Sequence, residues 1–294
     1  MSHRIPLVHG IGVHQPGWSK EWQLAFNKHL QLELDCYVET TWDSVFNARE
    51  GTRGPASSSI ASIELTPEEA LEEVRVRQEL EAILIARSSA LTGPESAAPT
   101  RGGRSDETVE WSSFGKSSNG DAGATRGFIP DWLLNPNESL GDFSKYLVSR
   151  NVRNAVKEVV KVALRDLVDS SQYQVSIVSH SWGTVVAYDS LLDLDVELPG
   201  LRVPTLMTFG SPLWLIRRLL EDRSGRKPPQ VGQWVNVHAR GDLVGAWLTP
   251  AGFKVDHEYE VPGFTGVGAH SSYFVEGNDE VQLKIVKPLI LGSV

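Results

Sequence analysis

Short apolar, β-branched runs alternate along this chain with stretches whose apolar residues recur at helical spacing. Because strands that alternate with helices pair in parallel and are covered on both faces, the pattern predicts an α/β fold with a mainly parallel sheet. The predicted strands are Ile5 to Val8, Cys36 to Trp42, Tyr173 to Val178, Val203 to Phe209, Trp234 to His238 and Glu258 to Val261. The predicted helices are Trp18 to Leu34, Thr66 to about Arg87, Val152 to Leu167, Leu213 to Glu221 and Asp279 to Leu291.

The alternation is interrupted between residues 43 and 137. After Asn47 the composition turns to Gly, Ser, Arg and Pro, and the helix from Thr66 opens with a capping box that Glu69 completes. Residues 92–127 are polar and carry few apolar side chains, so this segment cannot bury enough surface to order itself alone. We expect one domain over residues 1–294 with an insertion at 43–137, a possible lid whose residues 92–127 are flexible.

Charge, cysteine content and the amino-terminal stretch narrow the class of protein. A net charge of -9 repels nucleic-acid phosphates, and the single cysteine, Cys36, allows no disulfide within the chain. The opening MSHRIPLVHGIG has too short an apolar run for a signal peptide, and no stretch approaches a transmembrane helix. We therefore expect a cytoplasmic protein with no nucleic-acid partner. The composition gives no indication of its oligomeric state.

Neither a metal nor a cofactor is predicted. The eight histidines show no metal-ligand spacing with cysteine or carboxylates. The run Gly115-Lys116-Ser117 lacks the earlier glycine that a phosphate-binding loop requires.

The stretch IVSHSWGTVV at residues 177–186 begins in the predicted strand and continues into a further apolar run that looks like the start of a helix. A serine at the apex of such a turn needs small neighbours two residues away on each side, and Ser179 and Gly183 fill those places around Ser181. The turn would expose the Ser181 hydroxyl and bring the Trp182 backbone N–H to the helix N-terminus, where it can stabilise an oxyanion. The bare Ser-x-Ser-x-Gly pattern also suits an ordinary turn or helix cap, so both interpretations stay open on the motif alone.

Five short motifs follow one another in an order that suggests a family. They are VHGIG at 8–12, SHSWG at 179–183, FGSPL at 209–213, RGDLV at 240–244 and AHSSYF at 269–274. With these motifs the chain resembles the α/β-hydrolase superfamily of serine hydrolases, particularly its lipase-like and esterase-like members. It departs from the pattern in two places: Ser179 replaces the first glycine of the turn, and the chain starts at the His-Gly strand. The resemblance therefore implies an N-terminally trimmed α/β-hydrolase fold.

The resemblance implies a catalytic triad in the chain order serine, acid, histidine. Ser181 is the expected nucleophile. Asp242 follows the strand WVNVH through a glycine-containing turn and is the expected acid. His270 lies in a Gly- and Ser-rich loop after the strand EYEV and is the expected base.

Three other titratable residues compete for these roles. Asp256 immediately precedes the strand EYEV and so falls at the wrong end of the sheet. His238 lies within a predicted strand, and His180 adjoins the nucleophile, where its side chain should point into the layers of the fold. We expect both histidines to be structural.

The loop after the first strand is expected to complete the oxyanion hole. Ile11 is the first choice for the second backbone donor beside Trp182, with Gly12 in reserve. His9, Gly10 and Gly12 are further candidates for substrate binding, with His9 an orienting hydrogen-bond donor or acceptor rather than a base.

The expected activity is hydrolysis of a small-molecule or lipid carboxylic ester through an acyl-enzyme intermediate. From the insertion, Phe128, Trp132 and Leu133 are candidate contacts of the acyl chain, although they can equally serve to pack a lid against the body. A phospholipase, a thioesterase or an amidase would use the same triad. A non-catalytic binding or interaction protein on the same fold is the alternative from another class.

Overall fold

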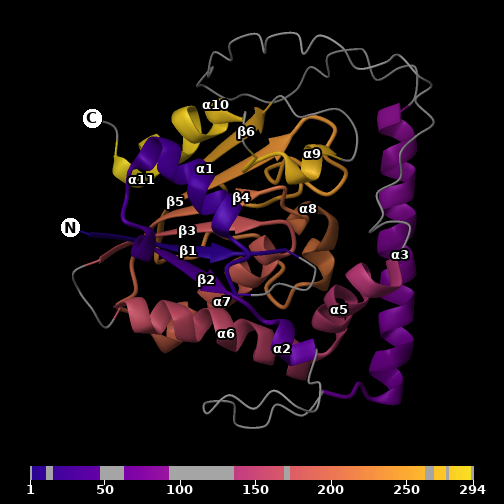
Figure 1. The fold of residues 1–294 in the computed structure, drawn as a ribbon. Helices are drawn as coiled ribbons and strands as arrows, with labels where there is room; N and C mark the ends of the chain where they lie inside the picture. The colour runs from indigo at the N-terminus through magenta and orange to yellow at the C-terminus, as the bar shows by residue number, and fades with distance from the viewer. Residues whose placement is uncertain are drawn as a thin grey trace.

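Six parallel strands form a single sheet in the computed structural model, which describes residues 2–10, 16–46, 63–92, 136–168, 173–261, 268–275 and 278–292. The strand order is β2-β1-β3-β4-β5-β6 (Figure 1). The strands are β1 (Ser2–Val8), β2 (Tyr37–Thr40), β3 (Tyr173–His180), β4 (Val203–Phe209), β5 (Val231–Ala239) and β6 (His257–Val261). The α/β class and the parallel sheet, both predicted from the alternation, are confirmed.

The strand order reverses at β1. The chain runs outward from β1 to β2, then returns to pair β3 on the other side of β1 and continues outward to β6. Val8 of β1 pairs with Ser179 of β3, so the residues that follow these two strands emerge side by side. In open α/β sheets, ligands bind beyond the carboxyl ends of the strands at such a reversal point. The topology therefore favours a site where β1 and β3 end.

Helices cover both faces of the sheet (Figure 1). One face carries α1 (Lys20–Leu30) and the C-terminal helices α10 (Asp279–Val281), the π-helical η3 (Gln282–Val286) and α11 (Lys287–Leu291). The other face carries α6 (Arg150–Val168) and α7 (Gly183–Glu197). Side chains alternate between these two layers along β1, as a strand's period of two requires: Ile5 and Leu7 pack on the first and Val8 on the second.

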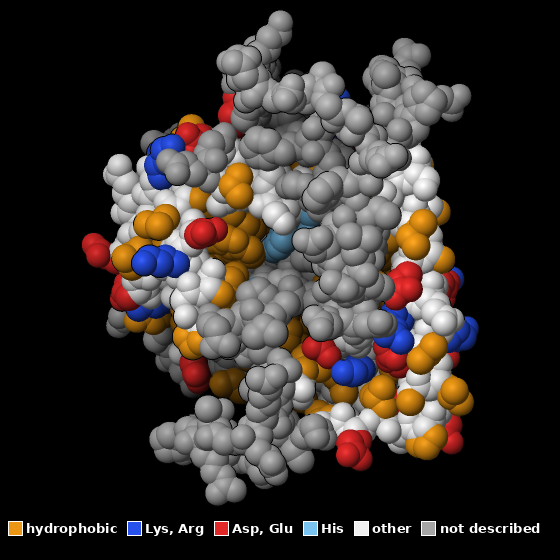
Figure 2. All heavy atoms as spheres, turned by 45° about the vertical axis from the view of Figure 1, so that its right-hand side comes forward, with side chains coloured by type: hydrophobic (Ala, Val, Ile, Leu, Met, Phe, Trp, Pro, Cys, Tyr) orange, Lys and Arg blue, Asp and Glu red, His pale blue; other side chains and the backbone are white. Residues whose placement is uncertain are grey.

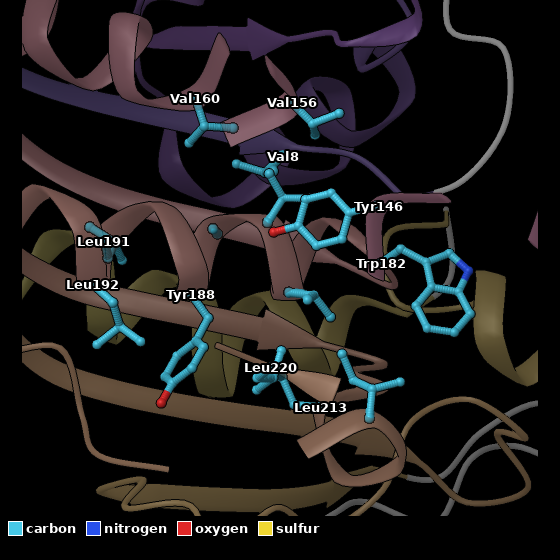
Figure 3. Packing of buried hydrophobic residues seen from close by; sticks show 14 of the residues in the cluster. Val8, Tyr146, Val156, Val160, Trp182, Tyr188, Leu191, Leu192, Leu213 and Leu220 are labelled. Atoms are coloured by element: carbon cyan, nitrogen blue, oxygen red, sulfur yellow. The ribbon is translucent and has the colours of Figure 1, made fainter. Parts of the chain in front are cut away.

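The second layer is a continuous hydrophobic cluster. Figure 3 shows Val156 and Val160 of α6 beside Val8 and Tyr146, with Leu191 and other α7 side chains in the same layer. Val156, Val160 and Leu191 are fully buried or nearly so. Complete burial of an aliphatic side chain contributes about 1.5–3 kcal/mol each. This buried cluster therefore packs against the ends of β1 and β3.

The helix α3 (Pro67–Thr92) stands apart from these layers, beside the end of the molecule that carries α8 (Leu213–Ile216) and α9 (Gly268–Ser271) (Figure 1). Its predicted capping box is present: the Glu69 amide donates to Thr66 Oγ1 at 3.2 Å, and the Thr66 amide donates to Glu69 Oε2 at 2.9 Å. The helix continues past Arg87, where the sequence prediction ended it.

Helix α3 is tied to the core along one face. Val76, Leu80 and Leu84 are buried at a spacing of four residues, which places them on one side of the helix. That side belongs to the same hydrophobic cluster as α5 (Pro136–Val148). A Ser144–Glu73 hydrogen bond also joins the two helices. The described part of the predicted insertion is thus a packed element of the fold.

Several predicted boundaries are wrong. The helix predicted over Trp18 to Leu34 ends at Leu30, because Gln31 takes a left-handed conformation with φ of 53°. A 3₁₀ turn, η1 (Leu34–Cys36), follows it. The helix predicted from Leu213 divides into α8 and a 3₁₀ turn, η2 (Arg217–Leu219).

Three helices were absent from the sequence prediction: α2 (Asp43–Phe46), α5 and the single turn α9, which contains His270 where a loop was predicted. Helix α2 is also a single turn, whereas α5 has thirteen residues. A signal for α5 was present, since Leu140, Phe143 and Leu147 recur at i, i+3 and i+7 and all three are buried. The predicted flexible segment at 92–127 lies outside the described residues apart from Thr92. Across the described ranges, no helix has the length and apolar character needed to cross a membrane.

Candidate active site

Ser181 occupies a strained turn between β3 and α7. Its φ of 56° is a left-handed value that residues other than glycine rarely adopt, and its amide donates to the Phe209 carbonyl at 2.9 Å. Two residues on, a β-carbon at Gly183 would collide with the carbonyl oxygens of Val8 and His9. The end of β1 thus passes so close to the start of α7 that only glycine fits there.

The neighbour of Ser181 on the strand side is also small. Ser179 is fully buried, and its hydroxyl donates to the Met207 carbonyl of β4 at 2.9 Å. A serine is therefore accommodated where the resemblance leads one to expect glycine. On the other flank Gly10 lies against the turn, because a β-carbon there would be 2.6 Å from Ser181 Cβ.

The structure brings together the three residues predicted as the triad: Ser181 from the turn after β3, Asp242 from the loop after β5, and His270 from α9, which follows β6 in the chain. Ser181 Oγ lies 2.8 Å from His270 Nε2, and His270 Nδ1 lies 3.0 Å from each carboxylate oxygen of Asp242. An ionised carboxylate only accepts hydrogen bonds, so Nδ1 carries the ring proton and donates it to Asp242. Nε2 of the neutral ring is then the acceptor for the Ser181 hydroxyl.

Asp242 is almost completely buried yet surrounded by donors. Its Oδ1 accepts from the Val244 and Gly245 amides at 2.8 and 2.9 Å, and its Oδ2 accepts from the Tyr273 hydroxyl at 2.6 Å. Burial alone would raise the pKa of Asp242, but His270 together with the Tyr273 and Gly245 hydrogen bonds holds that pKa well below its usual range. The carboxylate is therefore charged at neutral pH.

Trp182 follows Ser181 at the N-terminus of α7, with φ of −60° and ψ of −26°. The first N–H groups of a helix have no acceptor within it and form its positive end, so a negative charge that develops beside Ser181 would be stabilised there. The indole of Trp182 is buried and stacks on Phe143 of α5, with ring centroids 3.6 Å apart. This packing fixes the residue whose amide is the candidate oxyanion donor.

The two histidines next to the strand ends support the site without joining the triad. The His180 ring lies against the aromatic side chains of Trp22 and Phe274, as expected for a side chain between the layers. Its Nε2–H also donates to the His270 carbonyl at 2.8 Å. His9 is buried, donates from Nδ1 to the Gly10 carbonyl at 2.6 Å and stacks on Trp42.

Two of the competing residues, Asp256 and His238, lie elsewhere, as does Ser211 of the FGSPL motif. Asp256 is at the opposite end of the sheet, where it pairs with Lys227 and accepts from the Trp234 amide. The Ser211 hydroxyl is hydrogen-bonded to Thr184 Oγ1 at 2.8 Å. His238 is buried in β5, 3.5 Å from Glu260. None of these three side chains is among the hydrogen-bond partners of His270 given above.

Tyr273 is a residue that sequence reasoning missed. It lies three positions after His270, is fully buried, and its hydroxyl accepts from the Ala239 amide at 2.7 Å while donating to Asp242. Burial and the neighbouring Asp242 charge raise its pKa well above the usual value, so it keeps the proton that it donates. The AHSSYF motif contained this tyrosine, but no spacing rule assigns it to the acid.

Several predicted site residues lie outside the described ranges: Ile11, Gly12, Phe128, Trp132 and Leu133. On the face drawn in Figure 2, a histidine side chain is visible in a hollow beside a group of hydrophobic side chains. Over the described part of the chain, no group of three or more His, Cys, Asp or Glu residues is placed to hold a metal ion.

Comparison of the sequence with models of known protein families gives no match, and no curated protein matches it. The fold therefore defines the class of this protein as α/β with a parallel sheet. A fold of this class is compatible with many activities, so the chemistry of the site depends on the geometry of its side chains.

Proposed function

We propose that this protein is a serine hydrolase of the α/β-hydrolase type that cleaves carboxylic esters through an acyl-enzyme intermediate. The observation that carries the proposal is the chain of contacts from Ser181 through His270 to Asp242, with the serine at a φ of 56°. A nucleophile, a base within hydrogen-bond reach and a buried charged group that orients the base are the parts that acyl transfer requires.

In the first half-reaction, Ser181 Oγ attacks the ester carbonyl carbon and transfers its proton to His270 Nε2. The carbonyl oxygen becomes an oxyanion that the Trp182 amide stabilises at the N-terminus of α7. Asp242, charged and buried, stabilises the imidazolium. When the intermediate collapses, Nε2–H protonates the departing alcohol and the acyl group stays on Ser181.

In the second half-reaction, water replaces the alcohol. His270 Nε2 takes a proton from the water as its oxygen attacks the acyl carbon, and then returns the proton to Ser181 Oγ. The carboxylic acid leaves and the enzyme is restored. The buried Asp242 remains charged in both halves, because its hydrogen-bond donors stay in place.

The test combines a covalent probe with a substrate panel. A fluorophosphonate probe should label the wild type at Ser181, and Ser181→Ala should abolish labelling and lower ester turnover by at least about a thousandfold. Ser211→Ala is the matched control, because Ser211 is a buried serine after the neighbouring strand and has its own partner, Thr184. Labelling that persists in Ser181→Ala would assign the nucleophile to another residue.

The panel identifies the bond that is cleaved. It contains aryl esters of graded chain length, phospholipids, thioesters and amides, each tested against wild type and Ser181→Ala. We expect turnover of esters. Preferred cleavage of another member would identify the protein as a phospholipase, thioesterase or amidase with the same triad. A folded wild type that neither reacts with the probe nor turns over any member would be a non-catalytic binding protein.

A further inference from the structure

The loop that carries Asp242 is held by hydrogen bonds on both sides of its backbone. Its amides, from Val244 and Gly245, donate to the Asp242 carboxylate. Its carbonyls accept from outside the loop: Arg87 Nη2 donates to the Asp242 and Gly245 oxygens at 3.0 and 2.8 Å, and Trp214 Nε1 donates to the Val244 oxygen at 2.7 Å. The external donors thus hold the backbone of Asp242, Val244 and Gly245, and the last two of these residues also donate to the carboxylate.

Arg87 reaches this loop from far away in the sequence. It lies on α3, in the part of the chain inserted between β2 and β3, and 155 positions separate it from Asp242. Its guanidinium stacks over the Trp214 ring, with Cζ 4.7 Å from the ring centroid. Arg87 and Trp214 therefore form one contact surface for the loop.

Helix α3, which carries Arg87, is packed against the core. Helix α3 buries Val76, Leu80 and Leu84 in the hydrophobic cluster, and Glu79 pairs with Arg218 at the end of α8 and η2. A charged donor makes a stronger hydrogen bond to a carbonyl than a neutral one does. Arg87 can therefore transmit the fixed position of α3 to the loop.

The loop in turn cannot move without moving the carboxylate. A β-carbon on Gly245 would lie 2.6 Å from Asp242 Oδ2, so the backbone at Gly245 is packed directly against the carboxylate. Both carboxylate oxygens are 3.0 Å from His270 Nδ1, which makes the orientation of the imidazole depend on the position of this loop.

We propose that Arg87 is a positioning residue, by which the inserted helix α3 fixes the acid loop and so holds Asp242 in line with His270. The inference rests on the proposed function, because it assigns Arg87 a role in the same triad. It gives the inserted helix a part in turnover that is separate from any contact with substrate.

The principal variant is Arg87→Met, which keeps an unbranched side chain to pack on Trp214 but removes the donors. A displacement of about 1 Å in a catalytic group can cost about a hundredfold in rate, so we expect kcat on the best aryl ester to fall about ten- to a hundredfold. KM should change less than about threefold, because the Arg87 guanidinium bonds to the backbone of the acid loop and is proposed to act through it. Arg87→Lys retains one charged donor and should recover part of the loss.

The matched control is Arg75→Met on the same helix, where an exposed arginine pairs with Glu72. It should leave kcat within about twofold of wild type. Thermal unfolding of all variants checks that the fold is retained. If Arg87→Met does not fold, Arg87→Lys carries the same comparison through its smaller expected loss of kcat.

A double-mutant cycle separates positioning from general stabilisation. If Arg87 acts through Asp242, then Arg87→Met should cost less than about twofold in an Asp242→Asn background. An equal loss in both backgrounds, or an unchanged kcat in Arg87→Met, would overturn the inference while leaving the proposed function intact.

A spectroscopic measurement gives an answer even without turnover. The His270 Nδ1 proton, identified by its disappearance in His270→Ala, should shift or broaden in Arg87→Met and stay unchanged in Arg75→Met. An identical signal in Arg87→Met would overturn the inference. Failure of the proposed function is recognised separately, as a wild type that neither reacts with the probe nor cleaves any ester.

Discussion

Two aspartates in this protein are almost equally buried, yet their surroundings push their ionisation in opposite directions. Asp242, in the loop after β5, and Asp189, in the middle of α7, both accept a hydrogen bond from a buried tyrosine: Tyr273 at 2.6 Å and Tyr146 at 2.7 Å. The pKa of Asp242 lies well below its usual range. Burial raises the pKa of Asp189 to about 6, despite the nearby charges of Arg153 and Lys157.

The two aspartates differ in the backbone N–H groups that are available to donate to their carboxylates. In the loop, the Val244 and Gly245 amides are available to donate to Asp242, and His270 adds a further donor. In a helix interior, backbone amides are already bonded to carbonyls one turn back, so Asp189 receives no such help from its own helix. A buried charge at the strand ends is thus stabilised by the loop that carries it, which is a physical reason for functional groups to lie there.

The largest expected effect tests whether the charge of Asp242 serves turnover. Asp242→Asn keeps the size but removes the charge, and should lower kcat/KM by up to about ten-thousandfold because the wrong His270 tautomer is then favoured. Asp189→Asn, the same change in the other buried aspartate, should leave kcat/KM within about twofold. Steady-state kinetics on one ester substrate measures both.

A second arm shows whether Asp242 and His270 act as one unit. Asp242→Asn combined with His270→Ala should be little worse than the poorer single variant, because parts of one relay are not additive. Losses that multiply would mean that the two residues act independently. Near-normal activity of Asp242→Asn would remove the acid role from Asp242. Asp256, 3.0 Å from Lys227 at the opposite end of the sheet, lies too far away to take it over.

The next effect concerns stability and pH. Because the folded-state pKa of Asp189 is about 6, above its ordinary 3.8, the folded protein holds a proton there that the unfolded chain releases. Its contribution to the free energy of unfolding is therefore greatest below about pH 4 and declines as the pH rises through about 6. Asp189→Asn cannot ionise, so it should gain up to about 3 kcal/mol over wild type between pH 4 and pH 7.

Asp242 should show the opposite sign. A depressed pKa contributes stability above about pH 4, where the unfolded chain is ionised, and that contribution is lost only as the pH falls further. Asp242→Asn should therefore be less stable than wild type at pH 7, and the deficit should shrink in acid. Urea unfolding of the three proteins at several pH values measures both differences. If the differences in the free energy of unfolding did not change with pH, the contrast between the two aspartates would be contradicted.

Much of the fold could be predicted from the sequence, because local patterns specify it. The β-branched runs predicted all six strands, and Thr66 with Glu69 predicted the start of α3. The reversal of strand order at β1 was not predicted, since which strands become neighbours depends on long-range packing. Helix α5 was missed although its apolar residues, including Phe143, recur at helical spacing, because they directly follow a long polar stretch.

The site divides in the same way. The order of the short motifs predicted catalytic roles for Ser181, Asp242 and His270. The structure places the Ser181 and Asp242 side chains within hydrogen-bond distance of His270, and the roles themselves belong to the proposed function. Arg87 and Tyr273 could not be found in this way. Arg87 bonds to backbone carbonyls, which any residue supplies, and Tyr273 meets its partners only once the segment after α9 packs against the end of β5.

The smallest expected effect separates the two tyrosines that face the two aspartates. Tyr273→Phe removes one donor from Asp242 and leaves the Ala239 amide without the acceptor that it has now. The pKa of Asp242 should rise, but the His270, Val244 and Gly245 donors keep the carboxylate charged at neutral pH. Turnover should therefore fall only about tenfold, through looser orientation of the acid.

Tyr146→Phe removes the matching donor from Asp189 and should leave turnover within about twofold, even though we expect it to lower the unfolding temperature. In an Asp242→Asn background, Tyr273→Phe should cost little further activity, because the donor then no longer faces a charged acid. Equal losses of activity from the two tyrosine variants would show that both act through stability alone, and the distinction between an acid of lowered pKa in a loop and one of raised pKa in a helix would then have no bearing on turnover.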